Sequence, residues 1–167
     1  MQWLIISLVV MSLIGSVMWV MPTPRQKFQA RLRLRARTLG FQVQLAQLQL
    51  PRAQGEMEAE TLSVPVYRLA RTNLNRAERD AWVAWTVCRV ETVANQGLVP
   101  GWSWIKGEGA LPASALALLN EVLSRLPADV VALESTPIHL SAFWHEHDDG
   151  GLEQIHAEIT PLLEAKI

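Results

Sequence analysis

The chain has 167 residues, 15 Lys and Arg, 16 Asp and Glu, and a formal net charge of −1 at pH 7. Half of the residues are hydrophobic and 19% are charged, which excludes a largely disordered chain and indicates one folded domain. The single cysteine, Cys88, excludes an intramolecular disulfide framework and a four-cysteine zinc site.

The near-zero net charge conceals an uneven distribution of charge along the chain. Residues 1–55 carry seven basic side chains and no acidic one, so this part has a charge of +7. The rest of the chain carries all 16 acidic side chains and eight basic ones, a charge of −8. The mean charge therefore describes neither part.

The first segment, residues 1–21, contains no charged side chain. Its apolar run from Trp3 to Met21 corresponds to a helix roughly 28 Å long, close to the ~30 Å hydrocarbon core of a bilayer. Pro22 and Pro24 follow and end the helix. This pattern predicts a single transmembrane helix in the inner (plasma) membrane of a bacterium. A cleaved secretory signal is the alternative, although the segment lacks a basic first region and a clear cleavage site.

Residues 22–40 predict a basic juxtamembrane helix that ends near Gly40. Because basic residues beside a membrane span stay in the cytoplasm, we expect the N-terminus outside and the following domain in the cytoplasm. The same side chains suit an anionic lipid bilayer, whereas no aromatic residues interleave with them as nucleic-acid binding would favour. Ser12 and Ser16 in the preceding segment suit self-association through the membrane helix. The basic side chains are Arg25, Lys27, Arg31, Arg33, Arg35 and Arg37.

Residues 41–167 predict a small α+β domain in the order β-β-β-α-β-β-α, with a mainly antiparallel sheet. The alternation of apolar and polar residues shifts phase at Ala46-Gln47, which predicts a bulge in the first strand. Polar or glycine-rich composition predicts loops over 70–80 and 97–109. The predicted strands are 41–50, 56–69, 82–93, 130–133 and 138–145, and the predicted helices are 112–126 and the segment after Gly151.

The histidines supply the one candidate metal site. His145 and His147 lie two residues apart at the end of a predicted strand, so their side chains point the same way about 6–7 Å apart. A solvated polar turn is the other interpretation, because this pair alone lacks a third ligand. We therefore expect no cofactor, with a divalent metal at this pair as the alternative.

Seven tryptophans are many for a chain of this size. Trp102 and Trp104 fall in the predicted loop 97–109, beside glycine and proline. Because exposed tryptophan is a frequent interface anchor, these two are predicted to contact a partner protein. Burial at the end of the sheet is the other interpretation.

One layout resemblance concerns the first 45 residues or so. The apolar run Leu4 to Met21, the sequence Pro24-Arg25-Gln26-Lys27 and the sequence Gly40-Phe41-Gln42-Val43 resemble the YajC-type auxiliary subunit of the bacterial Sec translocase. That resemblance implies a short membrane helix with its N-terminus outside, and a Sec-associated accessory role. Residues 56–167 have no counterpart in it.

No nucleophile elbow, dinucleotide-binding loop or phosphate-binding loop occurs in the sequence. The leading hypothesis is therefore a single-pass membrane protein that presents a non-catalytic interaction domain to an unidentified membrane or cytoplasmic protein. The alternatives are a membrane-attached metal-dependent enzyme that uses His145 and His147, and a Sec-associated subunit.

Overall fold

The computed structural model describes the backbone of residues 2–20, 23–52, 60–148 and 150–167, and their side chains except those of 17–20. The chain divides into two compact units, residues 1–31 and residues 32–167. Helix α1 (Gln2–Val20) belongs to the first unit, and helix α2 (Pro24–Thr38) begins in the first unit and ends in the second.

Helix α1 covers the range that was predicted to cross a membrane. Among the residues that the structure describes, however, no helix has both the length and the apolar character that a membrane span requires. The polar residues Gln2, Ser7, Ser12 and Ser16 interrupt the apolar character of helix α1. The predictions of a transmembrane helix, of an inner-membrane location and of an outside N-terminus are therefore wrong.

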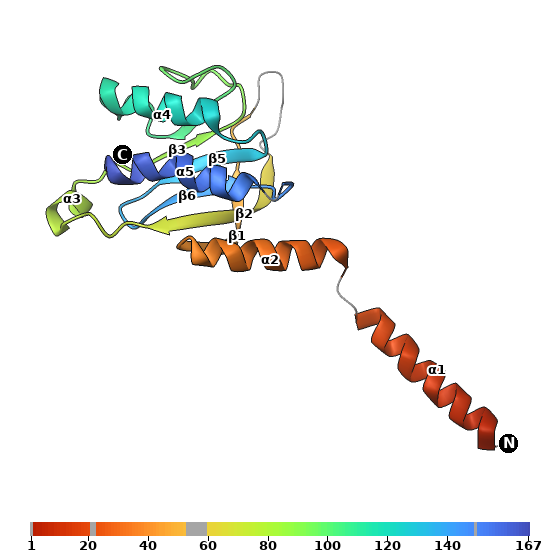
Figure 1. The fold of residues 1–167 in the computed structure, drawn as a ribbon. Coiled ribbons are helices and arrows are strands. Elements are labelled where there is room, and N and C mark those ends of the chain that lie inside the picture. Colours follow the sequence, from red (N-terminus) through yellow and green to blue (C-terminus); the bar gives the residue numbers. More distant parts are fainter. Residues whose placement is uncertain (1, 21–22, 53–59, 149) are drawn as a thin grey trace. The chain divides into compact units, whose positions relative to one another are not determined.

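The second unit is α+β, with one six-stranded sheet in which every neighbouring pair is antiparallel (Figure 1). The strand order is β1-β2-β6-β5-β3-β4, so β1 and β4 are the two edges. Helices α4 and α5 lie side by side, and α5 packs against β6. The elements are β1 (Phe41–Gln49), β2 (Thr61–Ala70), α3 (Arg76–Asp80), β3 (Trp85–Cys88), β4 (Ser103–Lys106), α4 (Ala113–Arg125), β5 (Val130–Ser135), β6 (His139–Trp144) and α5 (Gly151–Glu164).

Two elements lie where loops were predicted. Helix α3 interrupts the predicted loop 70–80, and strand β4 interrupts the predicted loop 97–109. The third predicted strand is shorter than expected, since only Trp85–Cys88 of 82–93 pairs in the sheet. Part of the second predicted strand, residues 56–59, lies outside the described residues.

Both faces of the sheet bury apolar side chains, at different ends of β1. Phe41 lies on the helix face, where its ring contacts Tyr67 of β2 and His156 of α5 at centroid distances of 5.7 and 5.5 Å. Leu48, seven residues later, lies on the opposite face in a cluster with Val64. The register between β1 and β2 is continuous, so the predicted bulge at Ala46-Gln47 is wrong. The phase shift instead arises because β1 buries Phe41 on one face of the sheet and Leu48 on the opposite face.

A row of polar side chains crosses the face of the sheet opposite to the ring of Phe41. Each member is the direct register partner of the next, and directly opposed residues share a face. The row therefore runs through all six strands beside the cluster that holds Leu48. Its members are Gln42, Arg68, Ser141, Glu134, Thr86 and Lys106.

Candidate functional site

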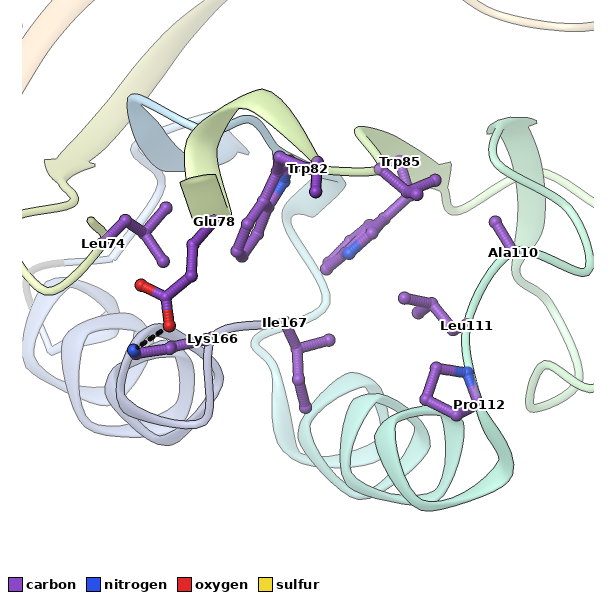
Figure 2. A pocket seen from close by; sticks show the side chains of 11 residues that line it. Leu74, Glu78, Trp82, Trp85, Ala110, Leu111, Pro112, Lys166 and Ile167 are labelled. Carbon is purple, nitrogen blue, oxygen red and sulfur yellow. Dashed lines mark hydrogen bonds and ion pairs between the residues drawn. The ribbon is translucent and has the colours of Figure 1, made fainter. Parts of the chain in front are cut away.

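A cleft of about 340 Å³ lies where α3, β3, the segment before α4 and the last residues after α5 meet (Figure 2). Trp82 and Trp85 form one wall, and Leu111 and Pro112 form the opposite wall. Ile167 lines a further side of the cleft, below Trp85 and next to Leu111 in Figure 2. We call this hollow the Trp cleft. Its size and its apolar walls with few polar groups are those of a ligand-binding pocket.

Helix α3 positions the first wall. Asn75 is its N-cap and accepts a hydrogen bond from the backbone N–H of Glu78, while the Glu78 carboxylate accepts one from the backbone N–H of Asn75. This reciprocal capping box stabilises a helix of only five residues. The chain then continues directly into Trp82 at the cleft wall.

The end of α5 positions the opposite side of the cleft mouth. The backbone N–H of Ile167 donates to Leu162 O and that of Lys166 donates to Leu163 O, which is a Schellman motif. Lys166 occupies the position where glycine is preferred, with a φ of 58°. Its ammonium group donates to the Glu78 carboxylate at 2.6 Å, so a charged pair closes the mouth beside Ile167 (Figure 2). This pair holds the pKa of Glu78 below its ordinary value.

Arg71 supports the first wall from behind. Its guanidinium carbon lies 4.3 Å from the centroid of the Trp82 ring, a cation–π contact that fixes the ring plane. The same guanidinium is only 3% exposed and donates to Thr136 O, Ser135 Oγ, Leu163 O and Ile167 O. Burial lowers the pKa of Arg71 to about 10, so the side chain remains a cation at neutral pH.

Two indole N–H groups at the cleft have no acceptor among the described residues. The Nε1 atoms of Trp82 and Trp85 are both buried and unpaired there, and the whole Trp85 side chain is 0% exposed. Figure 2 shows the nitrogen edge of Trp85 turned toward the space between Ile167 and Leu111. Buried donors are nearly always paired, so these two N–H groups, like that of the buried Trp144, lack an acceptor that the described residues do not supply.

A second hollow, of about 420 Å³, continues from the Trp cleft along α4. It shares the segment Leu111-Pro112 and the segment Lys166-Ile167 with the cleft, and Ala115 and Leu118 of α4 extend its lining. The two hollows adjoin at these four shared residues, and we call them together the groove.

The two tryptophans that were predicted to contact a partner lie elsewhere. Trp102 is 3% exposed with Arg89 stacked on its ring at 4.7 Å, and Trp104 is 4% exposed with its Nε1 donating to Gln96 O at 3.0 Å. Their contact with a partner stays a prediction that no observation tests.

His145 and His147 flank Glu146, whose φ of 57° ends the strand at Trp144. Their ring centroids are 5.6 Å apart, and Asp129 lies 3.7 Å from His147 Nδ1. Within the described part of the chain, no group of three or more potential ligands is placed to hold a metal ion. The neighbouring Asp149 lies outside the described residues.

The basic side chains of residues 25–37 divide between the two units. Arg33 pairs with Glu146 and Arg35 pairs with Glu153, so these two cations serve the fold of the second unit. Leu32 and Ala36 between them are buried. Arg25, Lys27, Arg31 and Arg37 are exposed, and their partners stay untested.

Comparison with known proteins found no matching family model, no matching curated protein and no matching solved structure. The layout resemblance of the first 45 residues to YajC-type subunits is therefore not supported by a family match.

Proposed function

We propose that residues 32–167 form a non-catalytic interaction module whose Trp cleft binds an apolar peptide segment. The bound segment places an aliphatic side chain between Trp82 and Leu111. Because the Trp85 side chain is 0% exposed, its ring turns as the segment binds, and its indole N–H then donates to a backbone carbonyl of the segment. The observation that carries this proposal is the pair of buried indole donors without an acceptor among the described residues.

Three features support a peptide over a small polar ligand. The cleft walls are mainly aromatic and aliphatic, so burial of an apolar side chain is favoured at roughly 25 cal/mol per Å². The groove continues along α4, which suits an elongated chain. The Glu78–Lys166 pair at the mouth offers a donor and an acceptor to a backbone that passes over it.

The strained backbone at Lys166 supports a functional role for this mouth. Lys166 and Glu146 are the two non-glycine residues with positive φ in the described structure. Glycine at position 166 would relieve the strain, but it would remove the charged pair with Glu78. A strained residue held by its side-chain partner is a frequent property of binding sites.

The test is a titration with short acetylated and amidated peptides of leucine and valine, followed by the indole N–H signals of the full chain in nuclear magnetic resonance spectra. We expect the Trp85 and Trp82 signals to move as their N–H groups gain an acceptor. The Trp104 signal is the internal control, because its N–H already donates to Gln96 O.

A matched pair of variants completes the test. Trp85→Phe keeps an aromatic ring and removes the donor, and it should weaken peptide binding about fivefold to tenfold, as expected for one lost hydrogen bond. Trp104→Phe makes the same chemical change away from the cleft and should leave binding unchanged. Equal effects of both variants, or unmoved Trp82 and Trp85 signals at millimolar peptide, would contradict the proposal.

A further inference from the structure

Strand β1 is an edge of the sheet without the usual protection against strand pairing. It spans nine residues, pairs with β2 alone among the residues that the structure describes, and shows no register shift. It contains no charged residue, no proline and no glycine, and Leu45 near its middle is 71% exposed. Long, regular and uncharged edge strands are templates for another strand.

The opposite edge of the sheet, β4, is protected against strand pairing. Strand β4 has only four residues, its register with β3 shifts, and it ends at the charged Lys106. Short length, irregular pairing and an end charge all discourage edge-to-edge pairing. Within the described part of residues 32–167, the sheet is thus protected against strand addition at β4 and unprotected at β1.

The backbone of β1 offers hydrogen-bonding groups on its outer side. In an antiparallel pair, alternate residues turn their N–H and C=O groups toward the neighbouring strand, and the others turn them away. Among the described residues, no backbone outside β2 bonds to residues 41–49. A hollow of about 510 Å³ lies along the first half of the strand, lined by residues 40–44 and by Arg37.

The charge around this hollow indicates the kind of strand that it would accept. Arg37, from the last turn of α2, is exposed and forms no salt bridge among the described residues. No acidic residue lines the hollow. A second copy of β1 is disfavoured, because that strand contains no acidic residue that could pair with Arg37.

We infer that β1 binds an extended acidic segment of another protein by antiparallel or parallel strand addition. The segment's backbone bonds to the outer edge of β1, and a carboxylate pairs with Arg37. This site is separate from the Trp cleft, so its failure in an experiment leaves the proposed function untouched.

The experiment uses the full chain and a labelled peptide that alternates valine and glutamate, with binding followed by fluorescence anisotropy. We expect binding that weakens at high salt, together with slower hydrogen exchange of the β1 amides and unmoved Trp85 indole signals. An N-methylated version of the same peptide cannot pair its backbone and should not bind. Equal binding of the N-methylated peptide would overturn the inference.

Arg37→Gln and Arg31→Gln form the matched variants, because both remove an exposed arginine from the same helix. Arg37→Gln should weaken peptide binding about fivefold to tenfold through loss of one charge-assisted hydrogen bond, and Arg31→Gln should leave it unchanged. Equal affinities for the two variants would overturn the role of Arg37. A concentration-dependent dimer that the peptide dissociates would show that the occupant is a second copy, which contradicts the inference.

Discussion

Arg33 and Glu146 form a two-pronged ion pair across 113 positions of the sequence: Arg33 Nε donates to Glu146 Oε1 at 3.0 Å, and Arg33 Nη2 donates to Oε2 at 3.1 Å. The Glu146 side chain is fully buried, whereas that of Arg33 is 44% exposed. The Tyr67 hydroxyl donates to the same carboxylate at 2.8 Å. One acidic side chain thus fastens the last part of α2 to the end of β6.

Glu146→Gln should lower the free energy of unfolding by about 1–3 kcal/mol, because it removes charge from an acceptor of two cationic donors and a hydroxyl. The partial exposure of Arg33 keeps the loss below that of a fully buried pair. Urea unfolding followed by circular dichroism measures the change. Glu153→Gln, which removes the charge of the half-buried partner of Arg35, is the control and should cost less than about 1 kcal/mol. Equal losses would show that the Glu146 contacts contribute little.

Alanine substitutions at Gly107 and Gly101 distinguish the cost of steric overlap from the cost of backbone strain. Both have a positive φ, of 87° and 85°. A Cβ at Gly107 would lie 2.7 Å from the Cβ of Trp85, whereas a Cβ at Gly101 would meet nothing within 4 Å. Gly101→Ala should therefore destabilise the fold by about 1–2 kcal/mol, the left-handed backbone cost alone. Gly107→Ala should cost about 1–3 kcal/mol more, because it displaces Trp85.

The same pair of variants reports on the cleft. Displacement of Trp85 should move its indole signal and weaken peptide binding in Gly107→Ala, with both unchanged in Gly101→Ala. If Gly107→Ala binds the leucine peptides as well as the parent chain does, the position of Trp85 does not determine the affinity of the cleft for peptide.

Local periodicity predicted the two longer helices α4 and α5 well. The apolar side chains that recur at helical spacing in α5, namely Leu152, Ile155, Ile159 and Leu162, are all 0% exposed. Helix α3 was missed although Asn75 and Glu78 carry a capping-box signal, because a five-residue helix shows no apolar period. The capping residues alone could have predicted its start.

The Trp cleft could not be predicted from local patterns. Its walls come from Leu74, Trp82, Leu111 and Ile167, which the fold assembles from four separate segments. The tryptophan count directed attention to Trp102 and Trp104, since glycine and proline surround them. Whether a tryptophan lies in a core or on a cleft wall depends on strand order, which is a non-local property.

The Trp cleft was missed by local patterns, whereas the membrane helix was predicted from a local pattern and is contradicted by the structure. That prediction was drawn from the composition of one segment. The basic residues after this segment were part of the membrane prediction. Two of them, Arg33 and Arg35, form ion pairs with acidic residues of the second unit. Their acidic partners lie more than 100 positions away in the sequence. The charge of residues 22–40 alone therefore could not predict these ion pairs.

Cys88 should react slowly with thiol reagents in the folded protein. Its side chain is 0% exposed, and burial raises the pKa of the thiol to about 11. Since the thiolate is the nucleophile, labelling with Ellman's reagent at about pH 8 should be at least ~100-fold slower than in the denatured chain. The rate should rise with urea in parallel with unfolding. Rapid labelling without denaturant would show that the cluster around Leu48 opens readily.

His139 should make the fold less stable in acid. Its Nδ1 lies 3.0 Å from Thr136 Oγ1 and 3.2 Å from Ser141 Oγ. Burial, chiefly, and the positive charges of Arg68 and Arg71 hold the pKa of His139 below its ordinary value of 6.5, with Glu134 acting in the opposite direction. The unfolded chain therefore binds this proton more readily than the folded chain does.

The stabilising effect of neutral His139 is thus fully present above about pH 6.5 and is lost as the pH falls through the lower folded-state pKa. The free energy of unfolding in urea should fall between about pH 7.5 and about pH 5, and this fall should be smaller in His139→Gln than in the parent chain. His147→Gln, which changes an exposed histidine, should keep the parent's loss. A nuclear magnetic resonance titration of the His139 ring with a midpoint above 6.5 would contradict the direction of the shift.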